Sequence, residues 1–495
     1  MQVALNIDAR SPRTLQEQVF DQIREIILSG RLNTGDPVPG SRALAEQLGV
    51  SRNTVTIAYD KLLAEGYLEI RPNVGTFVAS DLPDLALGLN RAAPPRAVEV
   101  PQRRARATIL DRMAATEFPV QAVRNPASAR LHTDFWLGRV DPRLFPVAEW
   151  RRILDVKLRH GRAPIAEYGD PSGLAALKRA IADHVGPARG IATGQDQIVV
   201  TAGSQDGLML IARAVTGHSR VFLHEDPGYS GAIHLFARSG MQCRPVPVDR
   251  DGLIVEALPE EPASVLYVTP SHQFPTGATL SLPRRLALLD WAERTDSLII
   301  EDDYDGDFRH DGAPLTALRG IDRTGRVLYL GTFSKSISPA LRLGFVLGSP
   351  AATGALTRWK QLLSNGPPWH MQATLAEFME SGAFQRHLRR IRATYRQRRD
   401  VLIAAIEAHF PGSEIIGRRG GMHLAWRLPE GIGARSLKKR ALMRGIGIYT
   451  AEDGGAWLSP GNDRHRDVLM LGYAAVEEAA IRAAIAALAG LCREG

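Results

Sequence analysis

Apolar residues in the first 80 positions follow a helical period and then an alternating one. Between residues 14 and 29 they recur at helical spacing, and Gly30 follows where a helix would end. Ser41 and Ser51 each precede a further short helical pattern, with Gly49 between the two, which predicts two capped helices joined by a tight turn. Residues 67–79 alternate on both sides of Pro72-Asn73-Val74-Gly75, as a two-stranded wing would. We therefore expect a first domain over residues 1–79.

The remaining chain has a different pattern. Residues 80–130 are rich in Pro, Ala and Arg with little periodicity, which predicts an extended linker with one short helix. From about Leu131, helical segments alternate with short apolar strands, which predicts an α/β domain with a largely parallel sheet over residues 131–495. The clearest strands are QIVVTAG, RVFLHED, SVLYVTP, SLIIEDD and RVLYLGT. From about Trp369, Arg-rich helices with few strands indicate a smaller C-terminal subdomain.

Composition adds limits to this picture. The chain has 495 residues, 44% of them hydrophobic and 23% charged, and no apolar stretch approaches the roughly 20 residues that span a bilayer. The first ten residues lack the order of a secretory signal, and Cys243 and Cys492 lie far apart, so we expect a cytoplasmic protein. The net charge of +8 permits contact with nucleic acid, but residues 1–79 are nearly charge-balanced. Charge alone does not identify a DNA-binding domain.

The two predicted helices after Ser41 and Ser51 carry side chains suited to contact DNA. A recognition helix needs short polar and cationic residues in its first turn, where it meets base edges and phosphates in the major groove. Arg42 on the preceding helix is suitably placed for a phosphate, and Gly75 and Thr76 at the wing tip for the backbone or minor groove. The recognition helix itself opens with Ser51, Arg52, Asn53 and Thr54. A helical protein-interaction module is the alternative. The stretch PGSRALAEQLGVSRNTVTIAYDKLLAEGYLEIRPNVGTFV resembles the GntR-type winged helix, whose partner is double-stranded operator DNA.

The α/β domain contains the groups that pyridoxal phosphate requires: an imine-forming lysine, an acid for the pyridine nitrogen, an aromatic face and a phosphate cradle. Lys335 follows the apolar strand VLYL among small hydroxyl residues, where its amine could meet the aldehyde. Asp302 ends the strand SLIIEDD, where a buried carboxylate would keep the pyridine nitrogen protonated, and Tyr304 could donate to the phenolic oxygen. Acids at strand ends are also common metal ligands, but no histidine follows at ligand spacing, so we expect no metal.

The phosphate cradle is predicted from two loops. Gly203, Ser204 and Gln205 lie between a strand and a helix, where backbone N–H groups and the helix dipole favour an anion. Thr332, Ser334 and Arg342 add two hydroxyls and a permanent cation around the lysine loop. Tyr229, after another strand, supplies the aromatic ring.

Taken in order, these motifs resemble the fold-type I aminotransferases from about residue 131 to 490. They are YGDPSG, TAGSQ, EDPGY, PSHQFPTG, EDDYD and SKSISPALRLG. Fused to a GntR-type module, the chain resembles the MocR/GabR family of regulators. The resemblance implies that Lys335 forms the imine, that Asp302 and Tyr304 contact the pyridine ring, and that Tyr229 stacks on it. It also implies that the hydroxyl, amide and arginine side chains above hold the phosphate and that Tyr168 reaches in from the other subunit of a homodimer.

One position departs from the aminotransferase pattern. PSHQFPTG has Phe274 where typical members have the asparagine of NPTG, which contacts the phenolic oxygen. His272 and Gln273 are the alternatives for that contact, and efficient transamination is less expected. The leading hypothesis is therefore a regulator in which a ligand at the cofactor site changes the geometry of the DNA-binding modules. A working aminotransferase with an accessory DNA-binding domain is the second, and a dimerisation domain without cofactor is the third.

The effector site also departs from the GABA-responsive members that the chain resembles. Those members grip the ligand carboxylate with one arginine two residues after the stacking tyrosine and another in the C-terminal strand, where this chain has Gly231 and Met470. A carboxylate buried without a cation or several donors is costly, so we do not expect GABA-like binding. The alternative is that another arginine reaches the site, from among Arg419, Arg427, Arg464 and Arg466. The expected effector is pyridoxal phosphate itself or an amino compound recognised differently.

Overall fold

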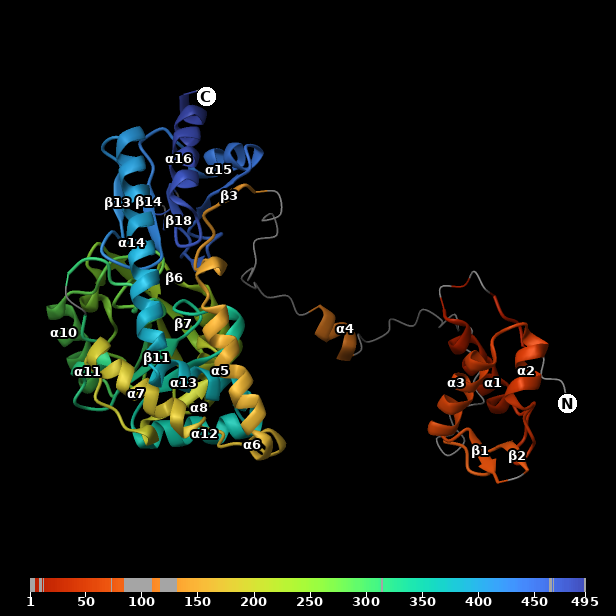
Figure 1. Cartoon of the computed structure of the whole chain (residues 1–495). Helices are drawn as coiled ribbons and strands as arrows, with labels where there is room; N and C mark the ends of the chain where they lie inside the picture. The colour runs from red at the N-terminus through yellow and green to blue at the C-terminus, as the bar shows by residue number, and fades with distance from the viewer. Residues whose placement is uncertain are drawn as a thin grey trace, which may run out of the picture. The chain divides into compact units, whose positions relative to one another are not determined.

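The computed structural model divides the chain into two compact units, Met1–Thr116 and Glu117–Gly495 (Figure 1). The residues that it describes are 5–8, 11, 13–72, 74–83, 109–115, 131–312, 315–462, 465 and 467–493. Within them, no helix is long and apolar enough to cross a membrane.

The first unit consists of a helical core followed by a hairpin. Its elements are α1 (Leu15–Leu28), α2 (Ser41–Leu48), α3 (Arg52–Ala64), β1 (Leu68–Arg71) and β2 (Gly75–Val78). Thr14 caps α1 in a capping box, since its hydroxyl accepts from the N–H of Glu17 at 3.3 Å and the Glu17 carboxylate accepts from the N–H of Thr14 at 2.9 Å. The predicted apolar face of α1 is buried against α3, with Val19 and Ile23 almost fully covered.

The turn between α2 and α3 follows the prediction at one serine and departs from it at the other. Ser51 is the N-cap of α3, and its hydroxyl accepts from the N–H of Thr54 at 3.1 Å. Ser41 was expected to cap α2, but the helix begins at Ser41 itself after Gly40, and no side chain caps it. Gly49 ends α2 with a φ of 66°, a conformation that glycine adopts without strain.

The predicted wing is an antiparallel hairpin. Leu68 pairs with Val78 and Arg71 with Gly75, so the tip lies between residues 71 and 75; Asn73 is outside the described residues. The predicted linker, residues 80–130, also lies mostly outside them. Its described part contains one short helix, α4 (Ile109–Ala114).

The second unit contains an eight-stranded sheet in the order β4-β12-β11-β10-β9-β5-β7-β8. Strands β7, β5, β9, β10 and β11 run parallel, and β12 is antiparallel to both of its neighbours, β11 and β4. The bounds are β4 (Ile198–Thr201), β5 (Val221–Asp226), β7 (Gln242–Asp249), β8 (Gly252–Leu253), β9 (Val265–Val268), β10 (Leu298–Asp302), β11 (Val327–Thr332) and β12 (Gly344–Leu347). The five predicted strands and the mainly parallel sheet are confirmed.

Helices accompany this sheet along the chain, as expected of an α/β domain. They are α5 (Val147–His160), α6 (Arg162–Ala166), α7 (Ala175–Arg189), α8 (Ser204–Val215), α9 (Ser230–Arg238), α10 (Leu282–Arg294), α11 (Leu318–Ile321), α12 (Pro350–Leu363) and α13 (Trp369–Glu380). Helix α13, which begins at Trp369, packs on α5 and α7. Both of these helices precede the large sheet in the chain.

A smaller sheet lies toward the C-terminus, in the order β13-β14-β18-β16. All its pairings are antiparallel. The strands are β13 (Glu414–Ile416), β14 (His423–Arg427), β16 (Tyr449–Thr450) and β18 (Val468–Gly472), and two helices, α14 (Ala383–His409) and α16 (Glu478–Arg493), pack on each other beside them. In Figure 1 the long α14 runs from beside these strands toward α7 and α13.

Two further strand pairs connect distant segments with this part of the chain. β3 (Thr133–Asp134) pairs with β15 (Ile446–Gly447), which follows α15 (Ala434–Met443), and β6 (Gly228–Tyr229) pairs with β17 (Ala456–Trp457). The segments around Thr133 and around Tyr229 are therefore both held by strands of the C-terminal region.

Candidate functional site

Glu301 and Asp302 end β10 and Asp303 follows directly, and the structure gives each of these acids different partners. Glu301 accepts the backbone N–H groups of Leu318 and Arg319 at 2.8 and 2.9 Å. Asp303 accepts from the Tyr329 hydroxyl at 2.6 Å and from Arg189 Nη2 at 2.7 Å. Both carboxylates are thus occupied by structural contacts.

Asp302 differs from its neighbours because one of its oxygens is unused. Oδ2 accepts from the Tyr267 hydroxyl at 2.8 Å, whereas Oδ1 is buried and has no hydrogen-bond partner in the described part of the chain. Burial raises the pKa of Asp302 to about 7, although the Tyr267 hydrogen bond opposes this. A buried acceptor oxygen without a donor fits a cationic N–H group, such as a protonated pyridine nitrogen.

Lys335 lies in the turn after β11 and approaches the segment that opens the second unit. Its Nζ donates to the carbonyl of Gly138 at 3.2 Å. A Cβ at position 138 would lie 2.4 Å from Nζ, so a larger residue there would displace the amine from this position. Burial lowers the pKa of Lys335, while the charges of Asp305 and Asp302 raise it. The lowered pKa increases the fraction of neutral amine, which is the nucleophilic form.

The predicted phosphate residues come together at the start of α8. Gly203 precedes the helix, and a Cβ there would lie 2.9 Å from Arg342 Nη2, so the guanidinium group lies directly beside this turn. Thr332 Oγ1 donates to Ser334 Oγ at 3.0 Å. Thr332 also pairs with Gly344 on β12, and a Cβ added at Gly344 would lie 3.0 Å from Gly203 Cα, so the two loops lie against each other. Two hydroxyls, a helix N-terminus and a cation therefore surround one place.

The aromatic residues also converge. The Tyr229 hydroxyl donates to Gln205 Oε1 at 3.3 Å, which connects Tyr229 to the first turn of α8. The ring of Phe274 meets Tyr229 and Tyr304 edge to face, with centroid separations of 5.9 and 6.0 Å. Phe274 thus fills an apolar position between the two tyrosines.

The two alternatives for the missing asparagine are now distinguishable. The Gln273 amide nitrogen lies within hydrogen-bond distance of the Glu225 carboxylate at 3.2 Å and of the carbonyls of Pro227 and Phe274 at 2.8 and 2.6 Å. Its donors are therefore used by Glu225 and Pro227 at the end of β5 and by the next residue of its own loop. His272 instead faces Tyr304 and Asp305, with Nδ1 at 3.1 and 2.8 Å from their oxygens.

The prediction of no metal site considered only histidines close to the β10 acids along the chain, whereas the fold brings distant histidines near Asp305, which follows that strand. His272 and His423 both lie near Asp305, with potential ligand atoms within 4.8 Å of one another. In this structure His272 Nδ1 and Asp305 Oδ2 lie 2.8 Å apart and bond directly to each other.

Neither position expected for an effector arginine has room for one. A Cβ at Gly231 would lie 2.5 Å from the Tyr229 ring and hydroxyl, because the ring covers that backbone. Met470 is fully buried on β18 in a small apolar cluster against which Leu137 and Phe274 pack. Of the alternative arginines, Arg427 pairs with Glu414 at 2.8 Å, Arg419 is exposed, and Arg464 and Arg466 lie outside the described residues.

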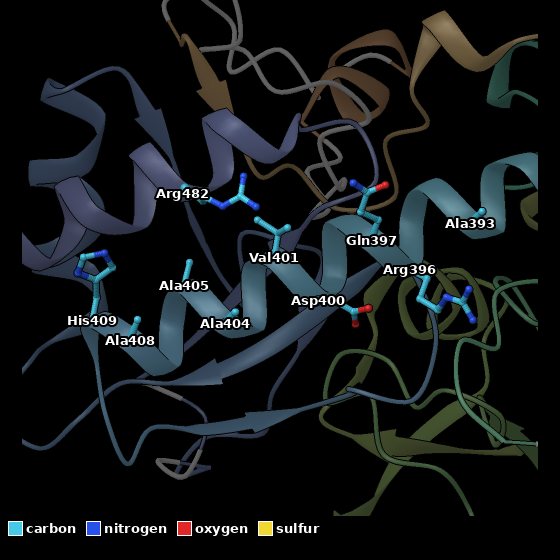
Figure 2. A pocket seen from close by; sticks show the side chains of 10 residues that line it. All are labelled: Ala393, Arg396, Gln397, Asp400, Val401, Ala404, Ala405, Ala408, His409 and Arg482. Carbon is cyan, nitrogen blue, oxygen red and sulfur yellow. The ribbon is translucent and has the colours of Figure 1, made fainter.

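A groove of about 840 Å³ lies away from this site, along one face of α14 (Figure 2). Its floor is formed by small residues of that helix, with Arg482 of α16 on the opposite side. Of the described residues that line the groove, none is a predicted cofactor residue and none is a lysine.

The DNA-reading residues are exposed with one exception. Arg42, Ser51, Arg52, Asn53 and Gly75 are exposed, and Thr76 is half-buried. Thr54 is buried, and its hydroxyl lies 2.8 Å from that of Ser51, so it supports the cap of α3 and does not present itself to solvent. The predicted contact of Thr54 with DNA has no support in this geometry, because its side chain points inward.

Some site residues were not found from the sequence. Tyr267 has a weak signal, since it stands in the strand SVLYVTP just before the PSHQFPTG motif. Gly138 has none, because only the fold brings its carbonyl to Lys335. Tyr168 was predicted, and it is 90% exposed after α6, away from any described partner.

The fold and this constellation define an aminotransferase-like domain joined to a winged helix. The family model for aminotransferase class I and II matches residues 136–488, and the model for bacterial regulatory proteins of the gntR family matches residues 15–78. A solved structure of kynurenine aminotransferase from Pyrococcus horikoshii, in complex with PMP, is 29% identical, covers 76% of this chain and 95% of its own, and has a TM-score of 0.67.

Two relatives share both domains over nearly their full length. The probable rhizopine catabolism regulatory protein MocR of Rhizobium meliloti is 34% identical, covering 90% of this chain and 87% of its own. The pyridoxine biosynthesis transcriptional regulator PdxR of Corynebacterium glutamicum is 33% identical, covering 89% of each chain. The chain belongs to the MocR family of DNA-binding transcriptional regulators, in which a GntR-type winged helix is fused to an aminotransferase-like domain.

Proposed function

We propose that the aminotransferase-like unit binds pyridoxal phosphate through Lys335 and uses this site to sense a small molecule. The observation that carries the proposal is the free, buried Oδ1 of Asp302 in a site that also contains a lysine of lowered pKa. The pyridine N–H of the cofactor would be the missing donor. The fold class supports the same cofactor, since the kynurenine aminotransferase structure is a complex with PMP.

Each remaining residue has a role that its surroundings support. The cofactor supplies an electron-withdrawing ring and an aldehyde that reacts with amines. Lys335 would hold it covalently, Asp302 would keep the ring nitrogen protonated, and Tyr229 would cover the ring face. Its phosphate would be held by Ser204, Gln205, Thr332, Ser334 and Arg342, which already surround the N-terminus of α8.

The ligand side of the site favours an effector without a deeply buried carboxylate. Gly231 and Met470 leave that side apolar, with Phe274 and Leu137 among the neighbouring side chains. Pyridoxal phosphate itself is the effector that this arrangement supports best, because its anionic group is recognised at the phosphate turn instead. An apolar amine is the second candidate. PdxR, one of the relatives, is named as a regulator of pyridoxine biosynthesis.

Two partners complete the proposal. The exposed Arg42, Arg52, Asn53 and wing tip would contact operator DNA, with Arg52 at the N-terminus of α3 closest to the bases. Tyr168 would reach the cofactor site of a second copy of the chain, which makes the functional form a homodimer. Its 90% exposure is consistent with such a role.

The test combines chemical labelling with operator binding. Borohydride reduction of the purified protein followed by peptide mapping should place the cofactor on Lys335, and Lys335→Ala should carry no label. Operator affinity is then measured with the apo-protein, with added pyridoxal phosphate, and with a panel of amino and sulfonic acids. Label on another lysine would contradict the cofactor assignment, and operator affinity that ignores the cofactor but responds to GABA would contradict the effector assignment.

A further inference from the structure

His272 is a buried side chain that reaches Tyr304 but would not contact the cofactor itself. Its Nδ1 lies 3.1 Å from the Tyr304 hydroxyl oxygen and 2.8 Å from Asp305 Oδ2. The Tyr304 hydroxyl also lies 3.1 Å from the His272 carbonyl oxygen, to which it donates. The imidazole and the phenol are therefore joined at two points.

The imidazole ring is held by three close backbone approaches. A Cβ at Gly421 would lie 2.2 Å from its Cε1, and Cβ atoms at Gly277 and Gly417 would lie 3.0 and 3.2 Å from its Nε2. These glycines come from the loop after β9 and the loop between β13 and β14. Two distant parts of the chain thus fix the orientation of one ring, which is the arrangement expected of a positioning residue.

The surrounding charges determine which nitrogen carries the proton. The Asp305 carboxylate can only accept from Nδ1, so Nδ1 is protonated, and Nε2 is buried without a partner among the described residues. His423 packs on the same ring at a centroid distance of 4.8 Å and donates from Nε2 to the Pro275 carbonyl. Burial lowers the pKa of His423 to about 3, so this neighbour is neutral.

The other titratable groups nearby come from separate elements. Asp302 ends β10, and Lys335 lies in the turn after β11. His310 lies in the segment that follows β10. Burial lowers the pKa of His310 to about 4, so it too is neutral near pH 7. Asp305 is therefore the one charged group in direct contact with the His272 ring among the described residues.

We propose that His272 positions the Tyr304 hydroxyl, taking over indirectly the task of the asparagine that Phe274 replaces. The Nδ1 proton, held by Asp305, is shared with the Tyr304 oxygen and leaves the phenol proton free to turn from the His272 carbonyl to the phenolic oxygen of the cofactor. This inference rests on the proposed function, since Tyr304 has that acceptor only when pyridoxal phosphate is bound. His272 acts through Tyr304 and does not touch the reacting atoms.

The consequence is a change in how firmly Lys335 holds a proton. A donor at the phenolic oxygen stabilises its negative charge and weakens the attraction between that oxygen and the protonated nitrogen of Lys335. Without the donor, this nitrogen keeps its proton up to a higher pH. A direct donor is expected to shift the midpoint by roughly 1–2 pH units, and a donor that acts through Tyr304 by less.

The experiment follows the visible absorption of the bound cofactor against pH in the full-length chain. Tyr304→Phe should raise the midpoint by roughly 1–2 pH units and His272→Phe by roughly 0.5–1. His272→Asn should restore a midpoint close to the wild type, because its amide nitrogen can take the place of Nδ1. Asp305→Asn should shift the midpoint toward that of His272→Phe, since its amide can donate to Nδ1 and reverse the tautomer.

His184→Asn is the matched control. His184 forms the same kind of pair with Asp307, at 3.1 Å, but packs on Phe384 and makes no described contact with Tyr304. Its midpoint should equal that of the wild type. If His272→Phe does not fold, as judged by circular dichroism, the comparison of Asp305→Asn with the control carries the test.

The outcomes separate the two proposals. A shift in Tyr304→Phe with none in either His272→Phe or Asp305→Asn overturns the role of His272 alone. Absence of a visible band in the wild type, or an unchanged midpoint in Tyr304→Phe, contradicts the proposed cofactor site instead. Stoichiometric zinc in the wild type that is lost in both His272→Phe and Asp305→Asn would also overturn the positioning role, because the cluster would then be a metal site.

Discussion

The two units place their functional residues in opposite environments. In the first unit, the residues proposed to read DNA lie within residues 42–76, and nearly all are exposed. In the second unit, the residues proposed to hold the cofactor come from segments between residues 138 and 342, and several are buried with shifted pKa values. A surface for recognising DNA can be built on a stable core without straining it, whereas a buried polar site must be balanced internally. Substitutions in the first unit should therefore change binding, and substitutions in the second should change stability as well.

The largest expected effect is on the buried ion pair behind the cofactor site. Arg189 and Asp303 have side chains only 5% and 1% exposed. Arg189→Met leaves the Asp303 carboxylate buried without its cation and should destabilise the second unit by about 3–5 kcal/mol. Differential scanning calorimetry of the full chain measures the loss. The control is Arg244→Ala, which breaks an exposed pair with Glu261 and should cost about 0–1 kcal/mol; equal losses in both variants would remove the contrast between buried and exposed charges.

The next effect is a pH dependence confined to the second unit. Burial raises the pKa of Glu225 to about 7 from its ordinary 4.5, so the folded state binds a proton that the unfolded state has lost. Stability should therefore fall as the pH rises from about 5 to about 8, by roughly 1–3 kcal/mol for this group. In cofactor-free protein, Glu225→Gln should reduce that fall. Unfolding midpoints at pH 5 and pH 8 measure it, and an undiminished fall in the variant would show that Glu225 is not responsible.

On the DNA side, Arg52→Ala should weaken operator binding by about 1–3 kcal/mol if Arg52 contacts a base. Its unfolding midpoint should stay that of the wild type, because the side chain is exposed. Fluorescence anisotropy with an operator fragment at several salt concentrations gives both the affinity and the salt dependence. The control is Arg13→Ala, which should bind normally. Arg13 is exposed, lies just before α1 and pairs with Asp21 on that helix. Loss of binding in both variants alike would indicate a general effect of charge.

The smallest effect is expected at Ser51, which both caps α3 and is proposed to contact DNA. Ser51→Ala removes the cap of α3 and should destabilise the first unit by about 0.5–2 kcal/mol. Ser51→Asp keeps a capping oxygen and should keep the stability, but its charge should weaken binding to phosphates. Thermal unfolding and anisotropy together separate the two effects. If Ser51→Asp binds DNA as the wild type does, Ser51 lies away from the DNA backbone.

The first unit was predictable in most details because its signals are local. The capping serine at 51, the tight turn at Gly49 and the alternating wing each depend on neighbours a few residues away. Two local details still failed. Ser41 begins α2 instead of capping it, because the helix starts one residue earlier than a Ser41 cap would require. Thr54 is buried, with its hydroxyl 2.8 Å from that of Ser51.

By itself, the sequence determined the two-domain order, the strands that end in chemistry and the residue types that pyridoxal phosphate requires, because motifs at strand ends meet at one edge of a parallel sheet. Only the tertiary structure decided how those residues are used. In the folded chain, Glu301 and Asp303 are hydrogen-bonded to structural partners, whereas one oxygen of Asp302 has no partner among the described residues. The fold also brings the Gly138 carbonyl to Lys335 and packs His272 between glycines more than a hundred residues apart in the chain. These choices depend on which polar atoms remain unpaired after packing, and no pattern along the chain records that.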